Sequence, residues 1–509
     1  MTTARTWAVA LTGVDGHMVE VESDVSNQTP EFRIIGLPDK SLGEAAQRVR
    51  NACANAGLDL PRRRMTVNLS PASLPKQGSG FDLAVAVSTL AASGMMPSRS
   101  IRQTVHIGEL GLDGRVRPVP GVLPAVFAAA RAGFERVVVP YANAEEARLV
   151  PEIEVCAVSS LAETAAVHGA EVEVPDVDAV EGPPSPVVDR HELDLSEVIG
   201  QDDAVEALVV AAAGGHHLLL SGPPGAGKTM LARRLPGILP ELADDEALEV
   251  AAIRSLAGEG VTRLDRTPPL EAPHHGASPA ALVGGGSRAA RPGAIVRAHR
   301  GVLFLDEAPE FSRIALDALR QPLESGRIEV HRAGFTAAYP ARFQLMLAMN
   351  PCPCGEYGVR GGECICPPIA IRRYASKLSG PLRDRIDIEL QVSRVAASAA
   401  TAGERSPVTT ASARRLVREA RAAAAARWAR TPWRRNADVP GERLRSGDLR
   451  LSREVRAPLD RALERGGLTL RGYDRTLRLS WTLADLAGAM SPGADEIGRA
   501  LYLKRGLAA

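Results

Sequence analysis

The chain has 509 residues, 45% of them apolar and 24% charged, which is ordinary for a globular protein of about three domains. No apolar stretch approaches the length of a membrane span, and the N-terminus lacks the apolar core of a signal peptide, so we expect a cytoplasmic protein. A net charge of only +1 excludes a basic coat protein that binds nucleic acid over its whole surface.

The first 172 residues alternate short β-rich runs with alanine-rich segments. The pattern predicts helices at 45–60, 81–94 and 123–133, and strands at 105–110 and 137–139. We therefore expect a separate α/β domain at 1–172.

Two runs in this domain, residues 75–82 and 108–121, resemble the proteolytic domain of the Lon proteases, which use a serine–lysine dyad. Aligning the runs places Gly80 where that family has its serine and Leu123 where it has its lysine, while Ser79 is one position out of register. The resemblance therefore implies a Lon-like fold whose protease site is degenerate. A ring-forming or ligand-binding role fits such a domain better than proteolysis.

An acidic, proline-rich segment follows. Residues 171–195 carry eight aspartates and glutamates against one arginine, with four prolines among them. This composition is typical of an extended linker. We place the linker at 173–193, ahead of a second domain at 194–395.

The strongest motif follows the apolar run 218–220 and precedes a segment of helical composition. Strand, glycine-rich loop and helix keep the G-x-x-x-x-G-K-[ST] spacing of a phosphate-binding loop. The glycines let successive N–H groups turn toward a phosphate, and the helix N-terminus adds its positive dipole end. Lys228, one of five lysines against 56 arginines, can reach the β- and γ-phosphates, and Thr229 can offer its hydroxyl to Mg²⁺. The predicted nucleotide contacts are Gly222, Pro223, Pro224, Gly225, Ala226, Gly227, Lys228 and Thr229.

Two further apolar runs end in polar residues suited to ATP hydrolysis. Residues 301–305 lead to Asp306, which suits the magnesium-bound phosphates, and to Glu307, which suits the base that orients an attacking water. Two carboxylates can instead cap a following helix, but the upstream loop favours the catalytic interpretation. Residues 343–349 lead to Asn350, which can hold the attacking water or the γ-phosphate, or simply stand in a turn.

Residues 326–339 contain two alternating stretches around Ala333 and Gly334, which predicts a β-hairpin. His331 and Arg332 lie near its tip and are candidates for contacts with DNA phosphates. A charged hairpin tip is also commonly just solvated, and the sequence leaves both interpretations open.

Six cysteines in a cytoplasmic protein do not indicate disulfides. Two of them are isolated, whereas Cys352, Cys354, Cys364 and Cys366 flank a glycine-rich loop within residues 352–366. Four thiolates so placed could form a tetrahedral zinc site. Their C-x-C pairs depart from the usual spacing of such sites, so reduced cysteines in a mobile loop are the alternative.

The C-terminal residues 396–509 carry 22 lysines and arginines against 12 aspartates and glutamates, a balance of +10. The region is either a solvated helical surface or a face for an anion such as nucleic acid. Within it, residues 422–435 interleave arginines with Trp428 and Trp433. That composition fits single-strand binding, but we favour an amphipathic helix that packs its tryptophans inward.

Taken in order, the motifs resemble the ComM/YifB family of magnesium-chelatase-like AAA+ ATPases. Besides the Lon-like runs, the phosphate-binding loop and the acidic pair, the matching segments are 198–201, 273–275, 294–299, 349–355, 379–387, 471–475 and 482–487. No single short motif is decisive, but the ordered set spans most of the chain.

This resemblance assigns roles to further residues. Arg385 falls on the arginine finger that reaches the ATP of a neighbouring subunit, with Arg383 as its competitor. Arg471 falls on the family's second sensor, and Gln201 falls near the adenine. A finger supplied in trans implies a homo-oligomeric ring, expected to be a hexamer.

We therefore expect an α/β P-loop AAA+ ATPase core with a Lon-protease-like N-terminal domain and a C-terminal helical lid at 396–509. Its expected cofactors are ATP and Mg²⁺, with structural Zn²⁺ left open. The resemblance implies a DNA helicase or branch-migration factor in DNA uptake and recombination. The alternatives are a magnesium-chelatase-type motor and an ATP-dependent protease, the latter disfavoured by Gly80 and Leu123.

Overall fold

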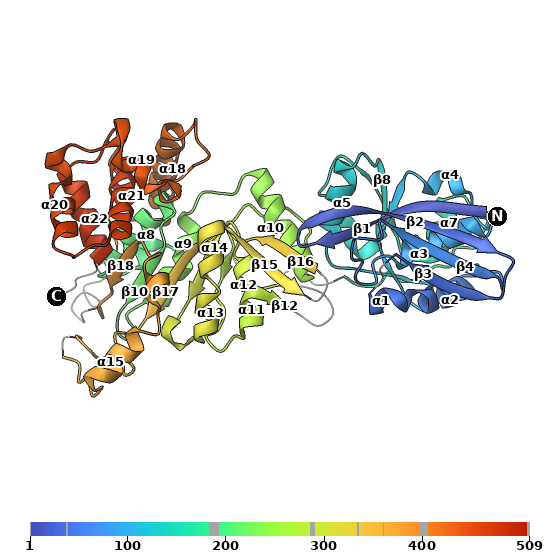
Figure 1. Cartoon of the computed structure of the whole chain (residues 1–509), viewed down its shortest axis with the longest axis horizontal. Coiled ribbons are helices and arrows are strands. Elements are labelled where there is room, and N and C mark those ends of the chain that lie inside the picture. Colours follow the sequence, from blue (N-terminus) through green and yellow to red (C-terminus); the bar gives the residue numbers. More distant parts are fainter. Residues whose placement is uncertain are drawn as a thin grey trace.

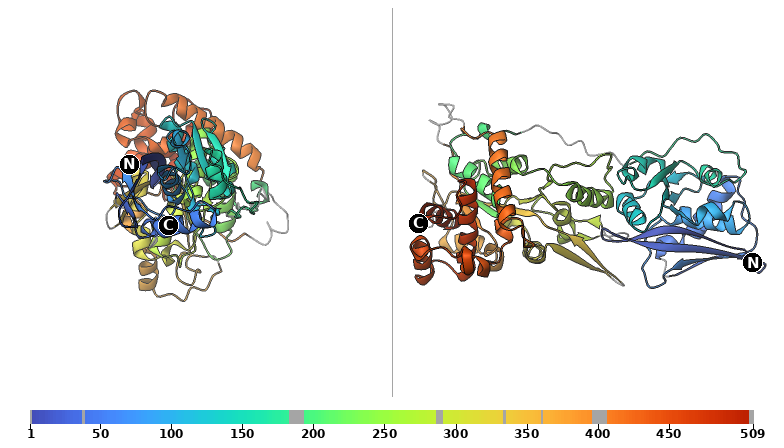
Figure 2. Two further views of the ribbon diagram at one scale, coloured as in Figure 1. Left: turned by 90° about the vertical axis from the view of Figure 1, so that its right-hand side faces the viewer. Right: turned by 90° about the horizontal axis from the view of Figure 1, so that it is seen from above.

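The chain forms three parts in a row, with its two ends at opposite extremes of the molecule (Figure 1). This computed structural model describes residues 2–36, 39–182, 193–285, 291–332, 335–359, 361–395 and 406–505. The views in Figure 2 show the same elongated arrangement end-on and from above. Among the helices in the described ranges, none combines the length and apolar composition needed to cross a membrane.

The first part is a seven-stranded sheet with helices packed on it. Its strands are β1 (Thr2–Thr12), β2 (Asp15–Ser26), β3 (Glu31–Ile35), β4 (Arg64–Ser70), β5 (Thr104–His106), β8 (Arg136–Pro140) and β9 (Glu154–Val158), with a small pair β6 (Glu109–Leu110) and β7 (Val116–Arg117). Its helices are α1 (Lys40–Gly43), α2 (Ala45–Asn55), α3 (Asp82–Ala92), α4 (Ser98–Ile101), α5 (Val122–Arg131), η1 (Tyr141–Asn143), α6 (Ala144–Ala147) and α7 (Leu161–Val167). The strand order is β3-β4-β2-β1-β5-β8-β9, antiparallel between β1 and β2 and between β2 and β4.

Sequence patterning accounts for these elements. Val19, Val21, Ser23 and Val25 of β2 are buried, and the residues that alternate with them are half-exposed, as in a strand with one covered face. Helix α3 is buried along its whole length. The helix expected at 45–60 ends at Asn55 because Gly57 takes a φ of +70°, which reverses the chain. The strand expected at 105–110 is divided between β5 and β6.

The second part is built on a five-stranded parallel sheet. Its strands are β10 (Leu218–Ser221), β11 (Leu270–Glu271), β14 (Val302–Leu305), β17 (Gln344–Met349) and β18 (Ile388–Gln391), in the order β11-β14-β17-β10-β18. Short pairs lie outside it: β12 (Gly284–Gly285) with β13 (Arg291–Pro292), and the hairpin β15 (Arg327–Arg332) with β16 (Phe335–Pro340). The helices are η2 (Leu195–Glu197), α8 (Asp202–Gly214), α9 (Lys228–Ile238), α10 (Asp244–Ala257), α11 (Pro279–Val283), α12 (Ala294–Arg297), η3 (Ala308–Glu310), α13 (Arg313–Asp317), α14 (Arg320–Ser325), α15 (Pro368–Ala375) and α16 (Gly380–Arg383).

Both faces of this sheet are covered, which explains its continuous apolar strands. Leu218 and Leu220 of β10 join a core with α8 and α9, whereas Leu219 joins the opposite core with α12 and α13. Every residue of β14 and of β17 is buried. The sheet is therefore a rigid platform for the loops at its edges.

The third part is helical throughout. It consists of α18 (Thr410–Arg427), η4 (Asn436–Asp438), α19 (Gly441–Arg445), η5 (Gly447–Leu449), α20 (Arg453–Glu464), α21 (Leu470–Leu486) and α22 (Ala494–Arg505). Trp428 is 2% exposed and donates its indole N–H to the Asn436 side chain at 3.1 Å. Trp433 is partly buried against the same cluster. The tryptophans therefore pack inward as expected, but they do so beyond the end of α18 at Arg427 and not within a helix.

The first part meets the second at the β1–β2 turn and at α5. A Cβ on Gly13 would stand 2.3 Å from the carbonyl oxygen of Ala338 in β16, so the turn lies directly on the hairpin. The Gly121 N–H donates to the Ser255 carbonyl in α10 at 3.0 Å. Residues of α5 and α10, among them Val122 and Ala251, share one buried cluster. The hairpin is thus packed between the five-stranded sheet and the N-terminal part.

Candidate nucleotide-binding site

The glycine-rich loop joins β10 to α9 at the carboxyl edge of the parallel sheet. Gly225 and Gly227 have φ values of 76° and 83°, in the left-handed region that favours glycine. Gly222 is confined by its surroundings, because a Cβ there would lie 2.1 Å from the Val392 carbonyl oxygen. The loop thus has the backbone turns and the helix N-terminus that phosphate binding requires.

Lys228 is held inside this loop. Its ammonium group donates to the carbonyl oxygens of Gly222 at 2.7 Å and Pro223 at 2.9 Å, and to Asn350 Oδ1 at 3.1 Å. Burial lowers the pKa of Lys228 from its usual value, and the carboxylates of Asp306 and Glu307 oppose that shift. The structure therefore brings the predicted phosphate-binding lysine, at the start of α9, into direct contact with Asn350, which follows β17.

Thr229 and Asp306 also meet. The Thr229 hydroxyl donates to Asp306 Oδ2 at 2.5 Å, and the other carboxylate oxygen accepts the Glu307 N–H at 2.9 Å. A hydroxyl beside a carboxylate at the end of a strand is an oxygen donor set that suits Mg²⁺, which binds through few protein ligands and substrate phosphates. These two residues fit the metal that accompanies ATP.

Glu307 follows directly and has an unusual backbone. Its φ of 50° is rare for a residue with a side chain, and strained conformations of this kind gather at functional sites. Its carboxylate lies 3.0 Å from His275 Nδ1, and the His274 ring stacks against His275 at 4.1 Å between centroids. Sequence reasoning gave His275 no role. The adjacent histidine pair within the family pattern was the only available signal.

Gln201 lies against the same loop. Its amide N–H donates to the Ala226 carbonyl at 2.6 Å, while its Oε1 is buried and has no hydrogen-bond partner among the described residues. Such an acceptor can receive the amino group of an adenine. The adenine contact stays a prediction, and its position beside the loop supports it.

The predicted finger and second sensor lie at the other edge of the sheet. Leu218 pairs with Ile388 and Ser221 with Gln391, so Arg385 precedes β18 where the phosphate-binding loop follows β10. Arg385 forms an ion pair with Glu324, and burial together with Arg320, Arg471 and Arg475 lowers its pKa. Within one chain, therefore, the structure does not bring Arg385 to Lys228.

Arg471 belongs to the same group of arginines. Its side chain is 73% exposed and lies 3.9 Å from Asp384. Arg383, the competing finger, directs both its Nε and Nη2 to Glu389, at 3.1 and 2.7 Å. The choice between Arg383 and Arg385 stays a prediction.

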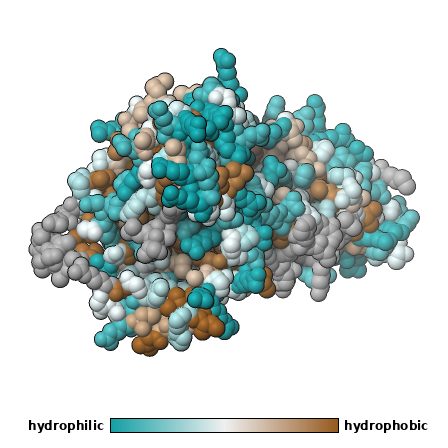
Figure 3. Space-filling model, turned by 60° about the vertical axis from the view of Figure 1, so that its left-hand side comes forward, coloured by the Kyte–Doolittle hydropathy of each residue, from teal (hydrophilic) through white to brown (hydrophobic). Residues whose placement is uncertain are grey.

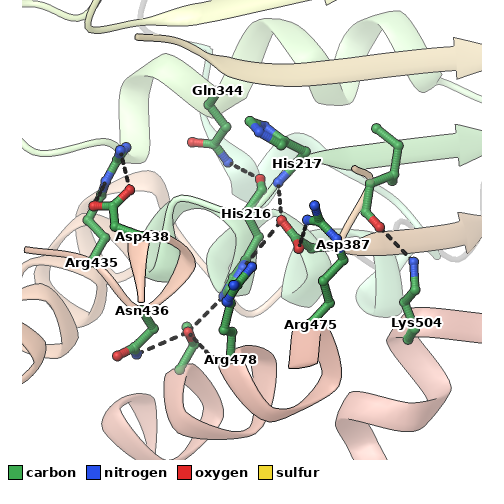
Figure 4. A network of polar contacts seen from close by, with 12 residues as sticks. His216, His217, Gln344, Asp387, Arg435, Asn436, Asp438, Arg475, Arg478 and Lys504 are labelled. Carbon is green, nitrogen blue, oxygen red and sulfur yellow. Dashed lines mark hydrogen bonds and ion pairs between the residues drawn. The ribbon is translucent and has the colours of Figure 1, made fainter. Parts of the chain in front are cut away.

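A buried polar network anchors this edge of the sheet to the helical lid (Figure 4). Asp387, 2% exposed, accepts the His217 N–H at 3.0 Å and pairs with Arg475 of α21. Burial alone would raise the pKa of Asp387, but Arg475 and His216 outweigh it and hold the pKa well below its usual range. His216 Nε2 lies 2.8 Å from the Thr482 hydroxyl on α21, which extends the network along that helix.

Other predicted residues are placed as follows. His331 and Arg332 stand at the end of β15, paired in register with Thr336 and Phe335, while residues 333–334 at the tip lie outside the described residues. In the N-terminal part, Leu123 is fully buried and Ser79 donates its hydroxyl to Glu109. The sulfurs of Cys352, Cys354, Cys364 and Cys366 all lie within 4.8 Å of one another.

Comparison with known proteins agrees with this geometry. Three family models match: "Magnesium chelatase, subunit ChlI" at residues 194–400, "Subunit ChlI of Mg-chelatase" at 21–143, and "Magnesium chelatase, subunit ChlI C-terminal" at 407–504. An uncharacterized protein of Mycobacterium tuberculosis is 49% identical over 508 residues, 99% of each chain. Competence protein ComM of Haemophilus influenzae is 40% identical over 504 residues, 98% of this chain and 97% of that one.

Two further relatives show how much of the chain each similarity covers. The YifB protein of Escherichia coli is 39% identical over 484 residues, 94% of this chain and 92% of that one. A Lon protease of Azorhizobium caulinodans is 27% identical over 151 residues, only 28% of this chain and 17% of that one. The similarity to Lon is therefore partial, whereas the similarity to ComM and YifB covers nearly the whole chain.

Replacing Glu307 by glutamine should leave nucleotide binding intact and lower kcat for ATP hydrolysis by about 100-fold or more, because the amide cannot act as a base. Steady-state ATPase assays and binding of a fluorescent ATP analogue would measure both quantities. Glu310→Gln is a matched control, since Glu310 lies three residues further on and pairs with Lys377 at the surface. His275→Ala should lower kcat less, with little change in ATP affinity. Undiminished turnover in Glu307→Gln would remove this carboxylate from the catalytic role.

Replacing Arg475 by alanine should destabilise the protein by about 3–5 kcal/mol, because it leaves the Asp387 carboxylate buried without its ionic partner. Thermal unfolding would show this as a clear fall in the melting temperature. Arg313→Ala is the control, since Arg313 is 84% exposed in its pair with Asp317 and such pairs contribute little. Equal melting temperatures for the two variants would contradict the anchoring role of the network.

Proposed function

Because the chain belongs to the ComM/YifB family of magnesium-chelatase-like AAA+ ATPases, we propose that it is a ring-shaped, ATP-driven motor that acts on DNA. The observation that carries the ring is the division of its ATP site. Lys228, Thr229 and Asp306 lie at one edge of the parallel sheet, and Arg385 lies at the opposite edge, across the full length of β10. A strand rises about 3.3 Å per residue, so no side-chain rotation brings the two halves together.

A second copy of the chain completes such a site. Arg385 of one subunit would approach the loop of its neighbour, exchanging its pair with Glu324 for the γ-phosphate. The exposed Arg471 stands beside it and would reach the same neighbour. Repetition of this head-to-tail contact closes a ring when the rotation between subunits allows it. We expect six subunits, as the family resemblance implies.

Each residue of the divided site has a distinct task. Lys228 binds the β- and γ-phosphates, and Thr229 and Asp306 hold the metal, which when bound neutralises charge on those phosphates. Glu307 orients the attacking water, with His275 fixing its carboxylate. Asn350 holds the γ-phosphate or the water beside Lys228. Arg385 of the neighbour stabilises the charge that develops on the transferred group.

The cysteine loop and the neighbouring helix α15 together present an exposed apolar surface. Ile365 is 86% exposed and Ile369 in α15 is 77% exposed. Figure 3 shows hydrophobic side chains gathered on the projection that carries α15. A neighbouring subunit in the ring would cover this surface and remove the cost of its exposure to water.

The proposal of DNA as the substrate rests on the family and on charge. The relative named a competence protein is similar over nearly the whole chain, and the family resemblance links that name to DNA uptake and recombination. The C-terminal region carries a balance of +10 at residues 396–509. The hairpin with His331 and Arg332 supplies candidate phosphate contacts. A motor of this kind works in the cytoplasm, without protease activity.

A metallochelatase motor is the second candidate. The observation that favours it is that all three matching family models are described by a magnesium chelatase subunit. Such a motor would hydrolyse ATP with the same divided site. It would respond to a porphyrin-binding partner and not to DNA, so the two candidates differ in what stimulates them.

Mixing two inactive variants tests the divided site. Arg385→Ala and Glu307→Gln should each lose ATPase activity, the former by about 1,000-fold. In a mixed ring, an Arg385→Ala subunit keeps Glu307 and receives Arg385 from a Glu307→Gln neighbour, so turnover should return. Persistent inactivity of a mixture shown to co-assemble would mean that each chain holds a complete site.

Two controls sharpen this experiment. The double variant Glu307→Gln with Arg385→Ala should restore no activity to either partner, because it offers neither half. The variant Arg383→Ala distinguishes the two candidate fingers. If Arg383 alone is the finger, Arg383→Ala loses activity and regains it in the mixture, while Arg385→Ala stays active.

DNA should stimulate the ATPase several-fold in low salt, and stimulation should fall as salt rises because phosphate contacts release counterions. Steady-state assays with single-stranded, duplex and branched DNA would measure the response. His331→Ala with Arg332→Ala should reduce it while basal turnover is kept. Absence of DNA binding and of stimulation in low salt would refute the DNA motor and leave the chelatase candidate.

A further inference from the structure

Four cysteine sulfurs meet beside the phosphate-binding loop. Cys352 Sγ lies 3.3 Å from Cys354 Sγ and 3.8 Å from Cys364 Sγ, and the last two sulfurs are 3.7 Å apart. Cys366 completes a group whose sulfurs are all within 4.8 Å of one another. Cys352 is fully buried, and the other three are half-buried.

These distances match one kind of ligand. In a tetrahedral site with metal–sulfur bonds of about 2.3 Å, neighbouring sulfurs stand about 3.8 Å apart. A disulfide requires about 2.05 Å, so the four cysteines are free thiols gathered at non-bonded distance. A cluster of four sulfurs with no oxygen or nitrogen donor selects soft, thiolate-binding metals over Mg²⁺ or Ca²⁺. We infer that Cys352, Cys354, Cys364 and Cys366 bind a structural Zn²⁺ ion.

The local backbone is shaped for such a site. Gly355 has a φ of 84° directly after the first cysteine pair, and its N–H donates to the Cys352 carbonyl at 3.0 Å. The next turn brings the Tyr357 N–H to 3.4 Å from Cys352 Sγ. Backbone N–H groups directed at a ligand sulfur stabilise its thiolate form. The loop thus provides four ligands and a hydrogen bond to one of them.

This cysteine loop is packed against the nucleotide site. A Cβ on Gly355 would lie 2.4 Å from Pro224 Cδ, so the loop touches the phosphate-binding loop itself. Arg394 joins the two, with its Nη2 at 2.6 Å from Glu356 and its Nε at 3.5 Å from the Pro224 carbonyl oxygen. Cys352 also lies only two residues after Asn350, and the Asn350 side chain accepts a hydrogen bond from the Lys228 ammonium group.

The zinc site therefore has a task beyond local folding. It fixes the segment that follows Asn350 and braces the outer side of the phosphate-binding loop at Pro224. In a reduced chain without metal, no bond would join the four thiols to one another, and the brace would loosen. Zinc should thus position Asn350 and Pro224 for ATP. That second step rests on the proposed ATP site, whereas zinc binding itself does not.

Metal content tests the site without reference to activity. Full-length protein purified under reducing conditions without chelator should contain about one zinc per chain by elemental analysis. Cys354→Ser with Cys364→Ser should lose it, and Cys156→Ser, a half-buried isolated cysteine, should keep it. After exchange with Co²⁺, the protein should show the intense visible bands of tetrahedral thiolate coordination, and the double variant should not.

Three results would overturn the assignment. These are a metal content near zero with no cobalt spectrum, iron in place of zinc, and a mass two or four hydrogens lower under non-reducing conditions, which shows disulfides. Circular dichroism of the double variant, compared with that of the parent, separates loss of the metal from loss of the fold. The cobalt spectrum of the unmutated chain decides the matter independently.

Binding of an ATP analogue tests the brace. Arg394→Ala should keep zinc but weaken ATP affinity about threefold, and removal of zinc should weaken affinity and lower kcat together. Equal ATP affinity and equal kcat with and without zinc would refute the brace while leaving the metal site intact. A chain that binds zinc but not ATP would refute the proposed ATPase and not the zinc site.

Discussion

Parallel hydrogen bonding of β10 with β17 and β18 is the constraint on which the rest of the molecule depends. Parallel strands bring every loop that follows a strand to one edge and every segment that precedes a strand to the other. The phosphate-binding loop, Asp306 and Asn350 follow their strands and therefore meet. Arg385 precedes β18 and is therefore excluded from its own nucleotide site. One rule of sheet geometry thus brings Lys228, Asp306 and Asn350 together and, in the proposed ring, leaves Arg385 to serve a neighbouring subunit.

The edge of the sheet that carries Arg385 is held as firmly as the edge that carries the phosphate-binding loop. Asp387 is buried where β18 begins, and its charge is supported by Arg475 and by the backbone of His217. Because Arg475 lies one turn after Arg471 on α21, the lid helix and the arginine edge are fixed relative to each other. The Lys504 ammonium group of α22 donates a hydrogen bond of 2.6 Å to the Ile386 carbonyl oxygen. In the proposed ring, a change in the lid of one subunit would therefore move the arginine that faces the ATP of the next subunit.

The catalytic edge is braced from outside by the cysteine loop, and the hairpin is braced by the N-terminal part. Contact of Gly355 with Pro224 and of Gly13 with Ala338 leaves no room for a side chain at either point. The Lon-like part thus contacts the core at the hairpin and at α10. Such packing requires neither the serine nor the lysine of a protease, and Gly80 and Leu123 stand at those two positions.

The sequence by itself determined the nucleotide chemistry. Spacing of residues 222–229 and the apolar runs before Asp306 and Asn350 were enough, because phosphate binding depends on local loop geometry and on strand ends. Local patterning also located the three helices expected in the N-terminal part, with an error at Asn55, where a glycine reverses the chain. Only the tertiary structure decided which distant residues meet. The contact of His275 with Glu307, the anchoring of Asp387, and the contact of Gly355 with Pro224 join segments from different parts of the chain, and no local pattern encodes such contacts.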